Sequence, residues 1–104
     1  MSGLRRLAEL FEPISQETPF GGRSTGWEAV GVVWLAPGRP RRRTRTEAGA
    51  APRPLETLTA EARIDLRLRP GRMLRFDGGD WRILAVAPHT PRPGRAALTL
   101  EREL

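Results

Sequence analysis

The sequence predicts an all-β protein, a small antiparallel β-barrel or sandwich of five or six strands with a long basic loop inserted. Three observations support this fold class. Apolar and polar residues alternate through much of the C-terminal half, Pro-Gly and Gly-Gly pairs separate short segments, and a β-branched run occurs in the N-terminal half. A period of two places alternate side chains on opposite faces of a strand. At 104 residues the chain has the size of one domain, and we expect residues 1–104 to form it.

The first twelve residues fit two conformations. Leucines recur at helical spacing from Leu4 to Leu10, and Ser2 is a suitable helix cap. The segment is short and is followed by Pro13, whose ring disfavours a helical Glu12. A short helix and a first strand are therefore both compatible with this stretch.

The segment Trp27–Ala36 is predicted to be a strand, which Pro37-Gly38 ends. Its apolar residues lie on both faces, with Trp34 on one and Val33 on the other. A strand that is apolar on both faces is usually central in a sheet or lies at a subunit contact.

A three-stranded meander is predicted between residues 62 and 87, preceded by a short helical turn over residues 55–61. Its strands are Ala62–Arg69, Arg72–Phe76 and Trp81–Ala87. Pro70-Gly71 and the segment Asp77–Asp80 supply the turns, because glycine accepts a positive φ.

A fifth strand is predicted at Ala97–Arg102, where alternation resumes after a proline-rich loop. We expect it to pair with the strand that begins at Trp81. In that strand the apolar spacing slips by one residue before Val86, which indicates a β-bulge. The residues expected to be largely buried are Trp34, Leu66, Leu68, Phe76, Trp81, Ile83 and Leu98.

Residues 38–54 form the most unusual stretch, a predicted flexible basic loop. All 18 basic residues of the chain are arginine, the formal net charge is +6, and six arginines fall in this segment. They are Arg39, Arg41, Arg42, Arg43, Arg45 and Arg53. A GC-rich genome accounts for arginine in place of lysine, but not for this clustering.

The basic loop has two interpretations. It lacks periodic apolar residues, so a solvated, disordered tract is one of them. The other is a contact with nucleic-acid backbone that reads no bases, because arginine matches phosphate oxygens and no aromatic side chains interleave for stacking.

The sequence predicts no enzyme, and neither a cofactor nor a metal. There is no cysteine, and His89 is the only histidine. Asp77 and Asp80 flank a Gly-Gly turn and are better explained as turn formers than as metal ligands. No apolar run is long enough to span a membrane, and the absence of cysteine fits a reducing compartment. We therefore expect a soluble protein without a membrane partner.

The order and spacing of several motifs resemble the head–tail joining family of tailed phages, which includes head-closure or stopper proteins. The resemblance covers roughly residues 20–36 and 62–102, and Pro19-Phe20 stands where the family often has an acidic residue. The motifs are Gly21-Gly22, Trp27, Val30, Val33-Trp34, Arg69-Pro70-Gly71, Phe76-Asp77-Gly78, Trp81-Arg82-Ile83 and Val86.

This resemblance implies a small β-barrel that assembles as a homo-oligomeric ring, six-fold by preference and twelve-fold as the alternative. The ring would lie in the neck of a virion or of a gene transfer agent, and would assemble in the bacterial cytoplasm. Its neighbours would be the portal or adaptor ring on one side and the tail terminator on the other. The loop after the Trp34 strand would reach the channel for double-stranded DNA.

A stand-alone β-barrel protein that binds nucleic acid in the cytoplasm is the alternative function. A platform of surface aromatic residues would favour it, because single-stranded nucleic acid stacks on aromatic rings. The expected burial of Trp34, Phe76 and Trp81 counts against such a platform.

Overall fold

A computed structural model describes residues 5–104, and within this range the chain is all β. Antiparallel pairing joins seven strands into one sheet. They are β1 (Arg6–Glu17), β2 (Arg23–Pro37), β3 (Arg41–Arg45), β4 (Arg53–Arg63), β5 (Met73–Phe76), β6 (Gly79–Pro88) and β7 (Arg95–Glu103). Over the same residues the structure has no helix long and apolar enough to cross a membrane.

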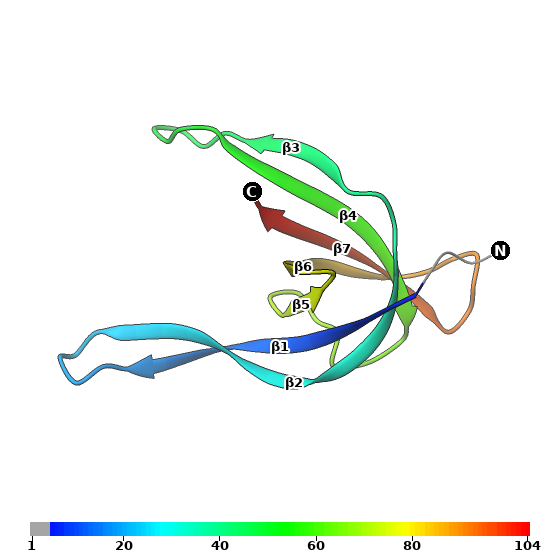
Figure 1. Cartoon of the computed structure of the whole chain (residues 1–104), viewed down its shortest axis with the longest axis horizontal. Helices are drawn as coiled ribbons and strands as arrows, with labels where there is room; N and C mark the ends of the chain where they lie inside the picture. Colours follow the sequence, from blue (N-terminus) through cyan, green and yellow to red (C-terminus); the bar gives the residue numbers. More distant parts are fainter. Residues whose placement is uncertain (1–4) are drawn as a thin grey trace.

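The sheet closes on itself as a small barrel. Its strand order is β2-β1-β5-β6-β7-β4-β3, and an additional pairing of β2 with β4 completes a ring of six strands. Strand β3 lies outside this ring and pairs with β4 (Figure 1). The predicted fold class, a small antiparallel barrel or sandwich, is confirmed.

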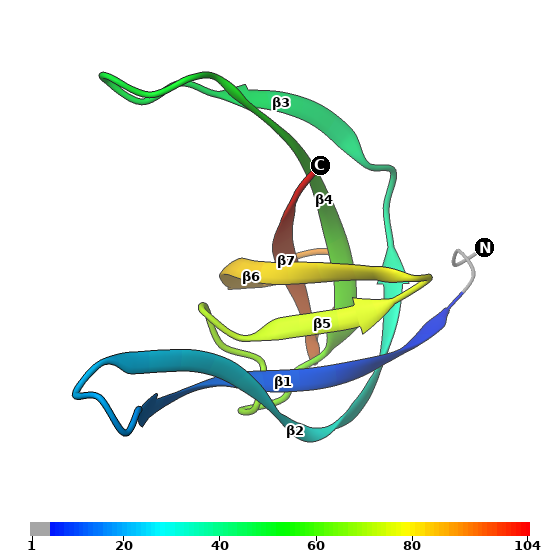
Figure 2. The same cartoon turned by 60° about the vertical axis from the view of Figure 1, so that its left-hand side comes forward.

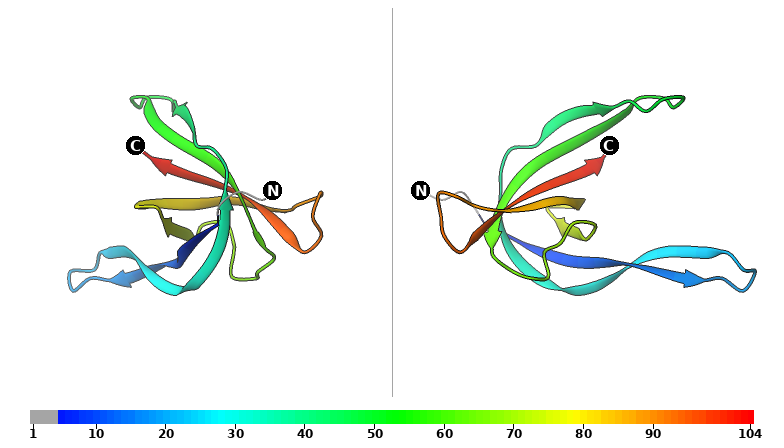
Figure 3. Two further views of the ribbon diagram at one scale, coloured as in Figure 1. Left: turned by 45° about the vertical axis from the view of Figure 1, so that its right-hand side comes forward. Right: turned by 180° about the vertical axis from the view of Figure 1, so that it is seen from behind.

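Two hairpins extend from the same side of the barrel (Figure 2). The longer one is formed by β1 and β2, and the whole of β1 pairs with residues 23–35 of β2. Only residues 9–11 of β1 pair with β5, and only residues 35–37 of β2 pair with β4. Residues 12–28 therefore form an arm beyond the barrel. The shorter hairpin joins β3 to the first half of β4, and Figure 3 shows both from behind.

The hairpin between β5 and β6 follows the predicted turn chemistry. Phe76 pairs with Gly79, so Asp77 and Gly78 form a two-residue loop. Both have positive φ, 51° and 74°, as a type I′ turn requires. The predicted bulge in the next strand is also present, because the register with β7 shifts between Ile83 and Ala85.

The barrel interior is a continuous apolar core that contains five of the seven residues expected there. They are Leu68, Phe76, Trp81, Ile83 and Leu98, all buried. Phe76 and Trp81 stack with ring centroids 6.0 Å apart. Leu10, Leu35, Leu74 and Leu100 complete the fully buried layer.

The prediction that Trp34 is buried is wrong. Val33 and Leu35 occupy the inward face of β2, so Trp34 points outward and is 60% exposed. Because β2 is apolar on both faces, its alternation defines which residues share a face but not which face is inside.

The predicted strand Ala62–Arg69 is also wrong, because β4 begins at Arg53 and ends at Arg63. The turn that follows is fixed by Asp65, whose Oδ1 accepts a hydrogen bond from the Arg67 amide at 2.9 Å. Such a bond to the backbone two residues on is an Asx-turn. Leu66 consequently projects into solvent, 88% exposed, although it had been expected in the core. The helical turn predicted for residues 55–61 is strand β4.

Strand β1 resolves the ambiguity at the N-terminus for the residues that the structure describes. Ala8 and Leu10 point into the barrel, and Leu7 and Glu9 point outward. The helical interpretation of this segment is therefore wrong from residue 6 onward. The proposed cap at Ser2 lies outside the described residues.

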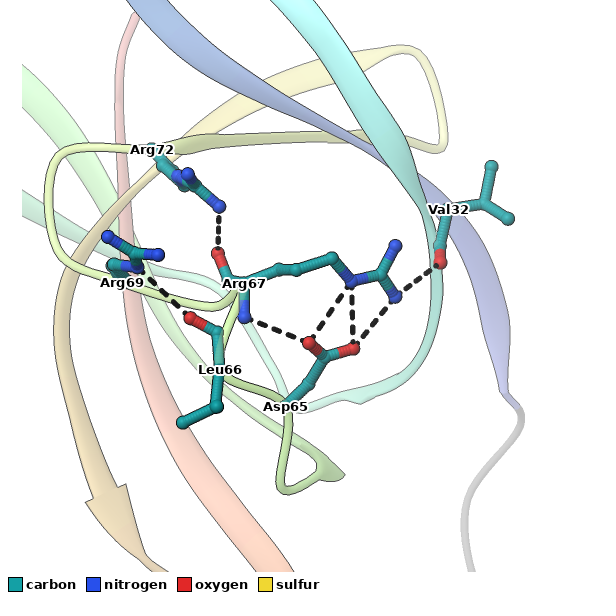
Figure 4. A network of polar contacts seen from close by, with 6 residues as sticks. All are labelled: Val32, Asp65, Leu66, Arg67, Arg69 and Arg72. Atoms are coloured by element: carbon teal, nitrogen blue, oxygen red, sulfur yellow. Dashed lines mark hydrogen bonds and ion pairs between the residues drawn. The ribbon is translucent and has the colours of Figure 1, made fainter.

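The guanidinium of Arg67 bridges the seam where β2 and β4 no longer pair (Figure 4). It donates to the Val32 carbonyl at 3.3 Å and to the Asp65 carboxylate at 2.7 Å. The backbone carbonyl of Arg67 accepts a hydrogen bond from the Arg72 guanidinium at 2.7 Å. The hydrogen bond from Arg67 lowers the pKa of Asp65. The loop is thus tied to β2 by side-chain contacts where backbone pairing has ended.

We expect Arg67→Met to lower the midpoint of chemical denaturation slightly, because it removes the contacts of Arg67 with both Val32 and Asp65. The depressed pKa of Asp65 stabilises the fold above its ordinary value of 3.8, and this stabilisation is lost as pH falls through the lower folded-state pKa. The difference between the variant and the parent should therefore shrink in acid. Arg69→Met is the control, since Arg69 bonds only the Leu66 carbonyl. An equal effect of both variants at every pH would contradict the bridging role.

Candidate nucleic-acid interface

The segment predicted to be a flexible basic loop, residues 38–54, contains an ordered strand, which corrects that prediction. Strand β3 pairs with β4 from Arg41 opposite Thr57 to Arg45 opposite Arg53. The prediction failed because β4 begins earlier than expected and offers a free edge. Backbone pairing along that edge requires no apolar side chains from the basic segment.

Gly38 positions β3 by a close approach to β4. Its amide donates to the Thr59 carbonyl at 2.8 Å, immediately after β2 leaves the same edge at Pro37. A Cβ atom at position 38 would lie 2.8 Å from the Thr59 carbonyl oxygen. Only glycine therefore permits this approach without a backbone shift.

We expect Gly38→Ala to destabilise the fold by about 1–3 kcal/mol, the usual cost of overpacking. Urea denaturation monitored by tryptophan fluorescence measures it. The matched control is Gly26→Ala, because a Cβ there meets only Ile14 side-chain carbons at 3.7 Å and beyond. Equal stability of the two variants would show that the contact does not constrain the start of β3.

The arginines of β3 divide between two faces. Alternation places Arg41, Arg43 and Arg45 on one face, and Arg42 and Thr44 on the other. All five residues are exposed. The strand therefore presents positive charge on both sides of the β3–β4 hairpin.

Two of the six predicted arginines are already neutralised within the chain. Arg45 donates two hydrogen bonds to the Glu101 carboxylate, at 2.8 and 3.0 Å, and Arg53 lies 3.5 Å from a Glu103 oxygen. No acidic group of residues 5–104 lies within 4.0 Å of the guanidinium of the remaining four. These four are Arg39, Arg41, Arg42 and Arg43.

A shallow groove of about 560 Å³ runs beside β3, across β4 and β7. Its wall combines three of the four uncompensated arginines with threonine hydroxyl groups from neighbouring strands. The groove is lined by Gly38, Arg39, Arg41, Arg43, Thr57, Leu58, Thr59, Leu84, Thr99 and Glu101. We call it the arginine–threonine groove.

The arginine–threonine groove has the chemistry of an anion site. Guanidinium and hydroxyl groups both donate to phosphate oxygens, and Arg45 already engages the single carboxylate, Glu101. No aromatic residue lines the groove, so it offers no surface on which a base could stack. The sequence did not predict a role for the threonines, because they lie on β4 and β7, outside the basic segment. Alternation in those two strands is the only sequence pattern that marks them.

Other chemistry is sparse in the part of the chain that the structure describes. Residues 5–104 contain no group of three or more histidine, cysteine, aspartate or glutamate side chains arranged to hold a metal ion. His89 lies beside Glu61, with its Nε2 3.9 Å from a carboxylate oxygen. The arginine–threonine groove is thus the strongest candidate site.

The fold and this site together define a small β-barrel with a basic hairpin suited to a phosphate backbone. No family model matches the chain, and no curated protein does. Among solved structures it is similar to a chain in the virion of a native gene transfer agent (GTA) particle. The two chains are 26% identical with a TM-score of 0.72, and the match covers 95% of this chain and 94% of that one.

Proposed function

We propose that this chain is a structural, non-enzymatic protein of a phage-like particle, either a gene transfer agent or a virion. The observation that carries the proposal is the likeness to a chain of a native GTA particle, which extends over nearly the full length of both chains. A match of that extent includes the two projecting hairpins as well as the barrel.

Within such a particle we assign the chain to the neck, as a stopper or head-closure ring between the DNA-filled head and the tail. The support is the resemblance to the head–tail joining family, whose motifs fall on β2, β5 and β6 and on the intervening turns. Copies would meet through heterologous contacts that close a ring. A six-fold ring is preferred over a twelve-fold one, with the portal or adaptor on one side and the tail terminator on the other.

The arginine–threonine groove and strand β3 would face the channel and contact the phosphates of double-stranded DNA. Four uncompensated arginines per copy repel one another, and an external anion relieves this repulsion. A ring repeats the group around a closed circle and produces a continuous positive collar. Such a collar attracts DNA of any sequence, because counterion release depends on the phosphates neutralised and not on the bases.

The assignment predicts that the protein adds to a portal complex as a ring. Neck rings often require the preceding ring as a template, so we expect a monomer in isolation and a multiple of six copies on the complex. Native mass measurement of the purified protein, with and without a candidate portal complex, tests this. A single bound copy, or none, would contradict the neck assignment.

One observation favours the alternative, a stand-alone nucleic-acid-binding barrel. Trp34 is exposed, which weakens the argument drawn from its expected burial, and Trp27 is exposed as well. Neither residue lines the arginine–threonine groove, however. We expect double-stranded DNA to bind at least as well as single-stranded DNA, without quenching of Trp34 fluorescence. Strong quenching of Trp34 by single-stranded DNA would favour the alternative.

A further inference from the structure

The tip of the β1–β2 arm presents a single aromatic side chain to solvent. Phe20 is 98% exposed. The turn that carries it is well tied, because the Thr18 amide donates to the Gly22 carbonyl at 2.8 Å and the Gly22 amide to the Thr18 hydroxyl at 3.0 Å. Gly21 takes the positive φ, 80°, that the turn requires. The aromatic ring is thus held out on an ordered turn, where exposure to water is unfavourable.

The opposite end of the same hairpin carries a second exposed apolar surface. Leu7 and Trp34 are directly opposite in the β1–β2 register, and Val32 lies two residues from Trp34 on the same face. Their exposed fractions are 51%, 60% and 52% respectively. We call these three residues the Trp34 patch. A contiguous apolar patch that includes tryptophan is typical of a protein interface.

A hollow of about 300 Å³ adjoins the Trp34 patch, at the seam that Arg67 bridges. Its rim is strongly basic, with Arg5, Arg63, Arg67 and Arg95 against a single acid, Asp65. Arg67 is paired with Asp65, and Arg95 lies 3.8 Å from a Glu61 oxygen. The other two arginines have no acidic partner within 4.0 Å among residues 5–104.

The arm carries a net charge of the opposite sign. Glu17 and Glu28 lie on it, both exposed, and neither has a basic group within 4.0 Å in the described part of the chain. Arg23, opposite Glu17 in the β1–β2 register, is the one basic residue of the arm. Glu17 is three residues from Phe20. The arm tip therefore combines an apolar anchor with a nearby carboxylate, and the hollow combines an apolar patch with unpaired arginines.

We propose that the arm tip of one copy docks on the Trp34 patch of a second copy, with Phe20 against Trp34 and Glu17 near Arg5 and Arg63. A copy cannot make this contact with itself. The patch and the tip lie at opposite ends of one hairpin (Figure 1), and thirteen extended residues span about 43 Å. The contact is therefore heterologous and repeats from copy to copy. It rests on the proposed function only in that the repeated contact would close the neck ring.

Disulfide trapping tests the contact cleanly, because the chain has no native cysteine. Pro19→Cys beside the tip and Val32→Cys in the patch leave Phe20 and Trp34 in place. The double variant, made together with the other proteins of the particle and mildly oxidised, should give a ladder of covalently linked copies. The control replaces Pro19 and Ala50, since Ala50 is exposed in the turn of the β3–β4 hairpin and lines neither the patch nor the hollow beside it, and it should remain monomeric.

Each outcome separates this contact from the proposed function. Assembled particles that contain the double variant at the neck but show no ladder overturn the contact and leave the neck assignment standing. A ladder formed by the purified protein, with none of it in particles, supports the contact and contradicts the neck assignment. If neither a ladder nor incorporation at the neck is observed, the arm contact and the neck assignment are both wrong. As a second measurement, Phe20→Ser should abolish the ladder, whereas Val86→Ser, at an exposed valine outside the patch, should preserve it.

Discussion

Particles that carry serine at Arg41, Arg42 and Arg43 are expected to assemble normally and to lose their DNA. The three side chains are exposed and make no ion pair within the described chain, so their removal should leave the fold intact. If each contacts one phosphate of double-stranded DNA, the slope of log affinity against log salt should fall in magnitude by about 2.7. At physiological salt this corresponds to roughly 100-fold weaker binding.

A second triple variant, which removes the same charge outside β3, tests whether the loss of DNA is specific to the β3 arginines. Arg23, Arg69 and Arg82 also lack an acidic partner among residues 5–104, and their replacement by serine removes the same charge elsewhere. DNA retention and head–tail joining should be assayed separately for both triple variants. Normal retention in the β3 variant would refute the DNA contact. Heads that fail to join tails would instead place β3 at an interface with a neighbouring ring.

Trp81→Ala is expected to lower the free energy of unfolding by about 3–5 kcal/mol, the usual cost of truncating a buried aromatic residue. Trp81 is 4% exposed, stacks on Phe76 and lies beneath the Arg102 guanidinium, which is 4.7 Å from its ring. Arg102 is held there by Glu56 at 2.6 Å. The loss is a large part of a total stability of about 5–15 kcal/mol.

Trp34→Ala is the matched control for the core prediction, because it makes the same chemical change at an exposed position. We expect its cost to stay below about 1 kcal/mol, as for most surface substitutions. Chemical denaturation followed by circular dichroism measures both variants. Equal losses would show that the two tryptophans do not differ in their contribution to the fold.

The two tryptophans also show what sequence patterns predict in this chain. The hairpin at Asp77-Gly78, the bulge before Val86 and the last three strands follow from turn chemistry and period, which are local properties. The inward face of β2 does not follow, because Val33 and Trp34 are both apolar and only the closure of the barrel selects between them. The alternation through Leu66 was misleading, since the side chain of Asp65 ends the strand within an unbroken pattern.

The candidate site was predictable in its charge and not in its geometry. Clustering in residues 38–54 identified the six arginines. Their separation into paired and uncompensated groups depends on Glu101 and Glu103, which lie on a strand far along the chain. The threonine hydroxyls of the groove likewise require the pairing of β4 with β3 and β7. Such contacts join segments about 50 residues apart, and no local pattern encodes them.

A density map of the assembled particle at side-chain resolution is the most direct test of the neck assignment. We expect this barrel as a closed ring of six copies between the portal or adaptor ring and the tail, with β3 directed at the DNA channel. The same fold found only in the capsid shell, the tail tube or the distal tail, or absent from the particle, would contradict the assignment.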